Sequence, residues 1–134
     1  MTHIIFTYGS LMFEEVWTRV VRSRYRSMPA VATDYARFAV RDETYPAMIA
    51  SQGSKVAGVV YCDVDESDVE ALDHFEGEDY RRCAIELTVG DGRALVAETY
   101  LYVNPTQLSQ DAWIPENFDM QRFIASYCRN KLGE

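Results

Sequence analysis

The strongest constraint on the fold is a pair of strand-like runs joined by a short turn. Residues 80–89 read YRRCAIELTV and residues 93–103 read RALVAETYLYV, with Gly90, Asp91 and Gly92 between them. β-Branched and aromatic residues favour extended backbone, and an Asp-Gly pair between two such runs is a strong hairpin signal. The sequence therefore predicts an antiparallel sheet that contains this hairpin.

Other strand-like segments precede the hairpin. They are a short apolar run at residues 3–8, two extended stretches at 30–40 and 45–50, and the β-rich run KVAGVVYCDV at 55–64. Proline cannot donate a ladder hydrogen bond, so Pro46 is expected at an edge or at the entry to a strand.

Two further features refine this reading of the strands. A glycine inside a strand often marks a bulge or a close backbone approach, and we expect one of these at Gly58. Residues 105–115 are expected to form a loop.

Three segments repeat apolar residues with a helical period. The first is FEEVWTRVVRS at 13–23, and the second is ESDVEALDHFE at 66–76, which Asp65 is expected to cap and Gly77 to end. We expect Asn117 to cap the last helix and Gly133 to end it. Its apolar stripe consists of Met120, Phe123, Ile124, Tyr127 and Cys128.

The element order predicts a mixed α+β fold with a closed or nearly closed sheet. Strands, a short helix, a hairpin and a final helix follow one another without the regular alternation of a doubly wound fold. A chain of 134 residues with no internal repeat is expected to form one domain, residues 1–134.

Charge and composition exclude several classes of partner. The net charge of −8 disfavours nucleic acid and anionic membrane surfaces. No apolar run approaches the roughly 20 residues that span a bilayer, and no secretory leader is visible. Three widely spaced cysteines without a CxxC pair favour reduced thiols, so a cytoplasmic location is expected.

The helix at 66–76 carries the first candidate for chemistry. At about 100° per residue, Val69 and Leu72 define its apolar face, Glu76 projects between them, and His74 points away. A carboxylate turned toward the core has a raised pKa, which suits a general base at neutral pH. The alternative is that the helix frays after His74 and leaves Glu76 solvated.

Other candidate features are weaker when each is taken alone. The YGSL segment at residues 8–11 is either a plain turn or a loop whose N–H groups face a small anionic ligand. It lacks the spacing of the common phosphate-binding loops, and His3 and His74 have no partner at useful spacing. No motif indicates a metal site, so no metal or other cofactor is expected.

Three motifs nevertheless occur in a fixed order. YGSL follows the first strand, the Gly58–Tyr61 segment reads GVVY, and the pattern LDxFEGxxYxR begins at Leu72. Together with YPAMI at 45–49, AETYLYV at 97–103 and the tail WIPENFDMQRFIASYC, they resemble the gamma-glutamyl cyclotransferase-like family. The resemblance is to its short branch, which includes plant avirulence-induced-gene-like proteins.

The resemblance implies a small β-barrel flanked by helices and a specific reaction. Family members cyclise a gamma-glutamyl group, so that its α-amine attacks the γ-carbonyl to give 5-oxoproline and a free amine. On this basis Glu76 is the catalytic acid and base, and the loop of Tyr8, Gly9, Ser10 and Leu11 binds the substrate's α-carboxylate region through its amides. Tyr8 and Tyr80 orient the substrate, and no metal, redox cofactor or covalent nucleophile is required.

The resemblance leaves two alternatives beside a gamma-glutamyl cyclotransferase. One keeps the same base but acts on a different amide, such as a gamma-glutamylamine. The other is a non-catalytic module that binds a small carboxylate on the same fold.

Overall fold

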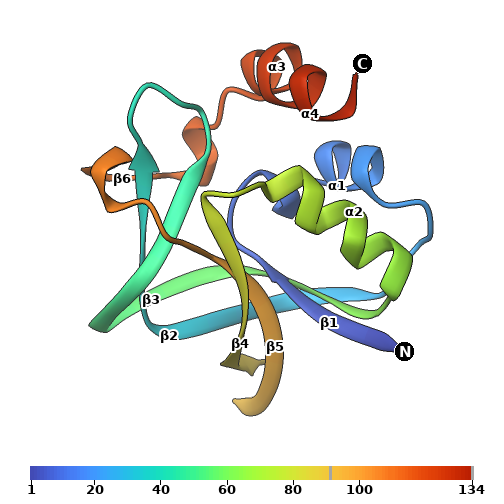
Figure 1. Ribbon diagram of the computed structural model, residues 1–134. Coiled ribbons are helices and arrows are strands. Elements are labelled where there is room, and N and C mark those ends of the chain that lie inside the picture. The colour runs from blue at the N-terminus through green and yellow to red at the C-terminus, as the bar shows by residue number, and fades with distance from the viewer. Residues whose placement is uncertain (91, 134) are drawn as a thin grey trace.

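A computed structural model describes residues 1–90 and 92–133 of the chain (Figure 1). Its strands are β1 (Thr2–Thr7), β2 (Ser27–Val40), β3 (Pro46–Asp65), β4 (Tyr80–Val89), β5 (Arg93–Tyr102) and β6 (Leu108–Ala112). Its α-helices are α1 (Glu14–Val20), α2 (Glu66–Glu76), α3 (Met120–Phe123) and α4 (Arg129–Leu132). Short 3₁₀ turns lie at Ser10–Met12, Pro105–Gln107 and Pro115–Asn117, and a π-helical turn at Ile124–Cys128 joins α3 to α4.

The strands form one sheet that closes on itself. The strand order is β3-β1-β5-β4-β2-β6, and an additional pairing between β2 and β3 joins the two sides. Only the β1–β5 pairing is parallel among the described pairs. The predicted α+β fold with a small barrel and flanking helices is therefore confirmed.

The predicted hairpin is present. β4 and β5 pair from Tyr80 opposite Tyr102 to Val89 opposite Arg93. Asp91, in the turn, lies outside the described residues.

The structure corrects two strand predictions. Residues 46–50 and 55–64 belong to one long strand, β3, and residue 45 precedes it. The register of β3 against β2 shifts opposite Asp34, whose carboxylate accepts a hydrogen bond from the Gly53 amide at 2.9 Å. Residues 105–115 are not a simple loop, because β6 pairs with the far part of β2. That pairing depends on a distant strand, so local sequence gave little sign of it.

The middle helix has the predicted boundaries. α2 begins after Asp65 and ends at Gly77, whose positive φ of 81° suits a residue without a side chain. The Asp65 side chain, however, makes no capping hydrogen bond. At the final helix, Asp119 rather than Asn117 caps: its carboxylate accepts a hydrogen bond from the Arg122 amide.

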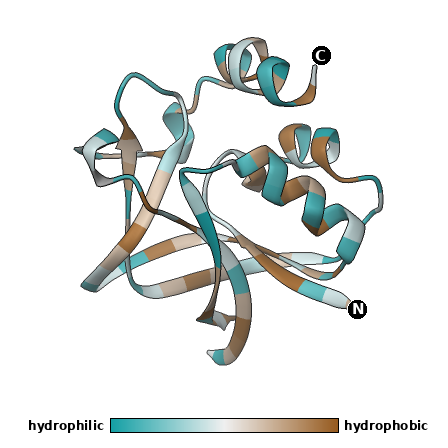
Figure 2. Cartoon of the chain, in the orientation of Figure 1, coloured by the Kyte–Doolittle hydropathy of each residue, from teal (hydrophilic) through white to brown (hydrophobic). Residues whose placement is uncertain are grey.

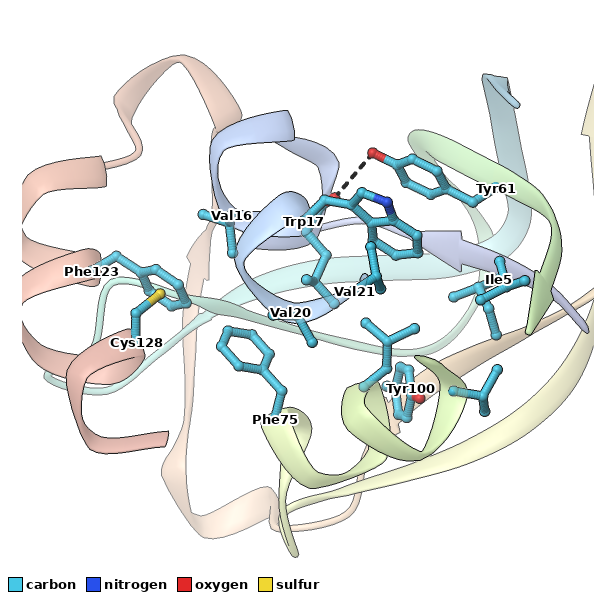
Figure 3. Packing of buried hydrophobic residues seen from close by; sticks show 14 residues of the cluster. Ile5, Val16, Trp17, Val20, Val21, Tyr61, Phe75, Tyr100, Phe123 and Cys128 are labelled. Atoms are coloured by element: carbon cyan, nitrogen blue, oxygen red, sulfur yellow. Dashed lines mark hydrogen bonds between the residues drawn. The ribbon is translucent and has the colours of Figure 1, made fainter. Parts of the chain in front are cut away.

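The two larger buried clusters hold most of the elements together. One fills the barrel and includes Phe6, Met48 and Leu87. The other lies between the sheet and the helices, where Trp17 and Tyr61 stack with ring centroids 3.7 Å apart (Figure 3). Hydrophobic and hydrophilic residues interchange along the strands, as expected for strands with one buried face (Figure 2).

The helices gather on one side of the barrel (Figure 1). The C-terminal helical segment, residues 120–132, lies next to α1 and α2 at this side, and Phe75 of α2 meets Phe123 with ring centroids 6.2 Å apart (Figure 3). In the described ranges, no helix is long and apolar enough to cross a membrane.

Candidate active site

A pocket opens where β1 ends, beneath the helices. Its cavity volume is about 30 Å³, and the empty space is about 420 Å³ when open solvent at the mouth is included. Its lining comes from β1 and the following loop, the start of β3, the end of α2, β4, β5 and the C-terminal helical segment. The lining residues are Phe6, Thr7, Tyr8, Gly9, Ser10, Leu11, Tyr45, Pro46, Phe75, Glu76, Tyr80, Tyr100, Phe123 and Tyr127.

All six predicted site residues lie in this one pocket. Tyr8 to Leu11 follow β1, Glu76 ends α2 and Tyr80 begins β4, so the fold brings together segments about seventy residues apart. Glu78 and Asp79, by contrast, lie in the exposed turn after Gly77.

The YGSL loop leaves β1 through a single 3₁₀ turn. Within the loop, the Gly9 carbonyl accepts a hydrogen bond from the Met12 amide at 3.0 Å, and the Ser10 carbonyl accepts one from the Phe13 amide at 3.1 Å. In the described part of the chain, the Gly9, Ser10 and Leu11 amides donate to no carbonyl of another turn, loop or cap. Because Gly9, Ser10 and Leu11 also line the pocket, their N–H groups are candidate donors for a ligand.

Gly9 is needed for a reason that the sequence did not reveal. A Cβ atom at Gly9 would lie 2.7 Å from Cγ and 2.8 Å from Cδ of Pro46. The loop thus approaches the first residue of β3 closely at Gly9. Pro46, which was expected at an edge or at the entry to a strand, is the first residue of β3 and packs against the loop at Gly9.

Glu76 faces the pocket from the last turn of α2. The helix does not fray after His74, since it continues to Glu76, and His74 is exposed. The residue keeps partial exposure, but protein atoms surround its carboxyl group, and this burial raises the pKa of Glu76 to about 8. The positive charge of Lys131 opposes the rise and the negative charge of Asp73 adds to it.

Two phenols of the pocket, Tyr8 and Tyr80, donate their protons to backbone carbonyls. The Tyr8 hydroxyl donates to the Tyr100 carbonyl at 2.5 Å, and the Tyr80 hydroxyl donates to the Pro46 carbonyl at 2.8 Å. Burial raises the pKa of Tyr8 and of Tyr80, so both phenols stay neutral. Each can then offer only lone pairs to a ligand, and these oxygens suit an ammonium group better than a carboxylate.

A chain of polar contacts anchors α2 behind the pocket. Asp73, one turn before Glu76, accepts hydrogen bonds from the Tyr100 hydroxyl at 2.6 Å and from Arg82 Nε at 2.9 Å. Arg82 also pairs with Glu98. Glu98 in turn contacts His3, whose other ring nitrogen contacts Glu66 at the start of α2.

Several pocket and near-pocket residues were not predicted as site residues, among them Tyr45, Phe123, Tyr127 and Lys131. Tyr45 belongs to the YPAMI segment. Phe123 and Tyr127 belong to the apolar stripe of the last helix, and such a stripe is typical of core residues. Lys131 had no sequence signal. It lies beside the pocket because the C-terminal helical segment packs against the end of α2.

Comparison with known proteins places the chain in a family. The family model described as "Gamma-glutamyl cyclotransferase, AIG2-like" matches residues 5–118. The chain belongs to this family, as its motifs indicated.

Individual relatives agree with this assignment. Protein AIG2 C of Arabidopsis thaliana is 32% identical over 104 residues, which cover 77% of this chain and 63% of that protein. The chain thus spans less than two thirds of the length of this relative.

Solved structures share the fold along most of the chain. A solution structure of an Arabidopsis thaliana protein superposes with a TM-score of 0.73 at 26% identity, covering 97% of this chain and 82% of that one. A structure named gamma-glutamyl cyclotransferase gives a TM-score of 0.67 at 20% identity and covers 78% of this chain and 68% of that one.

Proposed function

We propose that this protein cyclises a gamma-glutamyl amide to 5-oxoproline and releases an amine, with Glu76 as the general acid and base. The observation that carries the proposal is a glutamate with a pKa near 8 in the same pocket as the Gly9, Ser10 and Leu11 amides, which donate to no carbonyl of another described turn, loop or cap. A base whose pKa lies near the working pH can both accept and return a proton.

The two ends of the substrate would meet different parts of the pocket. The amides of Gly9, Ser10 and Leu11 are donors for the α-carboxylate. The α-ammonium would lie toward Glu76 and the hydroxyl oxygens of Tyr8 and Tyr80, which are acceptors.

The reaction then balances without a further reactant. The ammonium gives a proton to Glu76, and the free amine attacks the γ-carbonyl carbon to form the new C–N bond. Glu76 passes this proton to the amide nitrogen as the original C–N bond breaks and the amine leaves. The regenerated carboxylate then takes the second proton from the ring nitrogen and gives it to the released amine. Because the attack is intramolecular, holding the chain folded supplies much of the rate.

No metal, redox cofactor or covalent nucleophile takes part in this mechanism. The negative charge that develops on the carbonyl oxygen needs donors, and loop amides directed at that oxygen would stabilise it. The identity of the small-molecule amine is set by the parts of the pocket outside the loop.

The alternative function is a non-catalytic module that binds a small carboxylate. Such a module would use the same loop amides, but it has no need for a carboxyl group with a raised pKa. A pocket that buries Glu76 at a cost in stability is better explained by proton transfer.

The test is turnover by the purified protein and by Glu76→Gln. A panel of gamma-glutamyl compounds is assayed for 5-oxoproline, and Glu76→Gln is expected to lose roughly 10²–10⁴-fold in kcat/KM while still binding a substrate analogue. Glu78→Gln and Asp79→Asn are matched controls in the exposed turn and are expected to keep nearly full activity. Binding of the panel without 5-oxoproline would favour the binding module. Near-normal turnover by Glu76→Gln would refute the assigned base.

A further inference from the structure

The C-terminal helical segment, residues 120–132, completes the pocket although it lies beyond the part of the chain that the family model matches, residues 5–118. Phe123 and Tyr127 line the pocket from this segment. Tyr127 lies in the π-helical turn Ile124–Cys128, and such turns are uncommon and frequent at functional sites.

Tyr127 attaches the segment to the end of α2. Its hydroxyl lies within hydrogen-bond distance of two backbone carbonyls, 2.5 Å from that of Phe75 and 3.1 Å from that of Glu76. These carbonyls belong to the last turn of the helix, where carbonyls have no partner within the helix. The contact therefore fixes the backbone of the proposed base itself.

Lys131 lies beyond Tyr127 on the same segment. Its ammonium nitrogen is 5.6 Å from the centre of the Tyr127 ring. A Cβ atom at Gly77 would lie 2.7 Å from this nitrogen, so the ammonium occupies the space left by the missing side chain of the residue after Glu76. The Lys131 ammonium group thus lies next to the end of α2, close to both the Tyr127 ring and Gly77.

Among the described residues, the charged side chains that act on Glu76 are Asp73 on its own helix and Lys131. The other groups that interact with it electrostatically are phenols from several elements, and their pKa values are raised. The phenols are Tyr8, Tyr45, Tyr80, Tyr100 and Tyr127. Lys131 therefore supplies the positive charge that favours the ionised form of a carboxyl group inside a largely neutral pocket.

We propose that Lys131 is a positioning residue for Glu76, and that Lys131 and Tyr127 together let the C-terminal helical segment set the charge state and placement of the base. The proposal deepens the proposed function and rests on it for its kinetic consequence. The structural part concerns Glu76 alone and holds whether or not a substrate is turned over.

The direct test is the pKa of Glu76, measured by carbon-detected NMR titration of its carboxyl group in the full chain without substrate. Lys131→Met removes the charge and keeps much of the apolar stem. We expect the pKa of Glu76 to rise by about 0.5–1 unit, the size of effect for a neighbouring charge at a partly solvated site. Lys131→Arg keeps the charge and is expected to restore the wild-type value.

The chain offers a matched control for net charge. Lys55 is the other lysine of the sequence, and it is exposed on β3. Lys55→Met changes the net charge by the same amount and is expected to leave the pKa of Glu76 unchanged. If the pKa of Glu76 in Lys131→Met lies within about 0.2 unit of the wild-type value, the proposal is wrong. Equal shifts of this pKa in the two lysine variants would also overturn it.

The kinetic test uses the pH profile, which a merely structural role would not move. If the deprotonated base is required, a rise of 0.5–1 unit in its pKa lowers kcat/KM about 3–10-fold at pH 7 and has no effect well above pH 9. A uniform loss at every pH would contradict the role of the charge. A shifted titration without any turnover would instead keep the positioning role and refute the proposed function.

Tyr127→Phe tests the second contact separately. It retains the ring over which Lys131 lies but removes the hydroxyl that contacts the Phe75 and Glu76 carbonyls. We expect a loss of kcat that persists across pH, with the pKa of Glu76 moved less than in Lys131→Met. An unchanged kcat in Tyr127→Phe would remove Tyr127 from the proposal.

Discussion

The hydroxyl of Tyr100 donates to the carboxylate of Asp73 at 2.6 Å, one helical turn before Glu76. Arg82 contacts the same carboxylate from β4 through Nε at 2.9 Å and through its terminal nitrogen at 3.3 Å. A negative charge is thereby fixed close to the proposed base, where it raises the pKa of Glu76 in addition to the effect of burial.

Asp73→Asn should therefore move the pH profile in the direction opposite to Lys131→Met. Removing the negative charge is expected to lower the pKa of Glu76 by roughly 0.5 unit and to raise the fraction of active base at pH 7. The measurement is kcat/KM against pH beside the NMR titration of Glu76. A shift to higher pH in Asp73→Asn would show that repositioning of α2 outweighs the charge.

Wild-type activity should rise with pH up to about pH 8. The pKa of Glu76 is raised to about 8, so most of the protein carries a protonated carboxyl group at pH 7. We expect kcat/KM to increase about tenfold per pH unit below pH 7 and to level off above 8. A flat profile between pH 6 and about 9 would contradict a base with this pKa.

Stability should depend on Glu76 with a definite sign. The folded-state pKa lies above the ordinary value of 4.5, so the folded protein binds the proton more tightly and stability falls as pH rises from about 4.5 to 8. Glu76→Gln removes this dependence and is expected to stabilise the protein at pH 7 by an amount on the order of 1–3 kcal/mol. The free energies of unfolding of both proteins at pH 5 and at about pH 8 decide the point, and equal slopes would refute the prediction.

His3 should also make the stability of the protein fall as pH rises, but for a different reason. Its contacts with Glu66 and Glu98 raise its pKa, so the stability it contributes is complete below the ordinary value of 6.5 and is lost as pH rises through the raised value. His3→Gln is expected to remove that part of the dependence without changing the pKa of Glu76. Thermal unfolding between pH 6 and about 9 provides the test.

Gly9 should be sensitive to its contact with Pro46. A methyl group at Gly9 would lie 2.7 Å from Pro46 Cγ, so Gly9→Ala is expected to cost on the order of 1–3 kcal/mol and to weaken ligand binding by displacing the loop. Gly9→Val should be worse, although we expect the rest of the core to remain folded.

Pro46→Ala provides the check on this reason. If the clash is the cause, adding Pro46→Ala to Gly9→Ala should recover part of the loss, giving a non-zero coupling in a double-mutant cycle. Strictly additive losses of stability would show that the glycine is required for something other than this contact.

The sequence predicted what depends on local signals. Asp65 and Gly77 flank α2 as expected, because the signals for both ends of the helix lie within the segment itself. The helical period also predicted the side of the helix on which Glu76 lies, and Glu76 lines the pocket. β6 and Lys131 were missed, since β6 exists through its pairing with β2 and Lys131 matters through its place beside Gly77. The contact of Gly9 with Pro46 was not predicted, because it joins residues far apart in sequence.

The Tyr8 and Tyr80 hydroxyls donate their protons to backbone carbonyls, so toward a ligand they act only as acceptors. The resulting arrangement of donors and acceptors makes the pocket chiral toward its ligand. Donors lie on the loop side at Gly9 to Leu11, while the phenol oxygens and Glu76 can only accept or exchange protons. A γ-glutamyl group bears its carboxylate and its ammonium on one stereocentre, and its side chain must still reach the base. Only one enantiomer can place its carboxylate, its ammonium group and its side chain correctly at the same time. The protein should therefore discriminate between the L and D forms of a γ-glutamyl compound even where the released amine is identical.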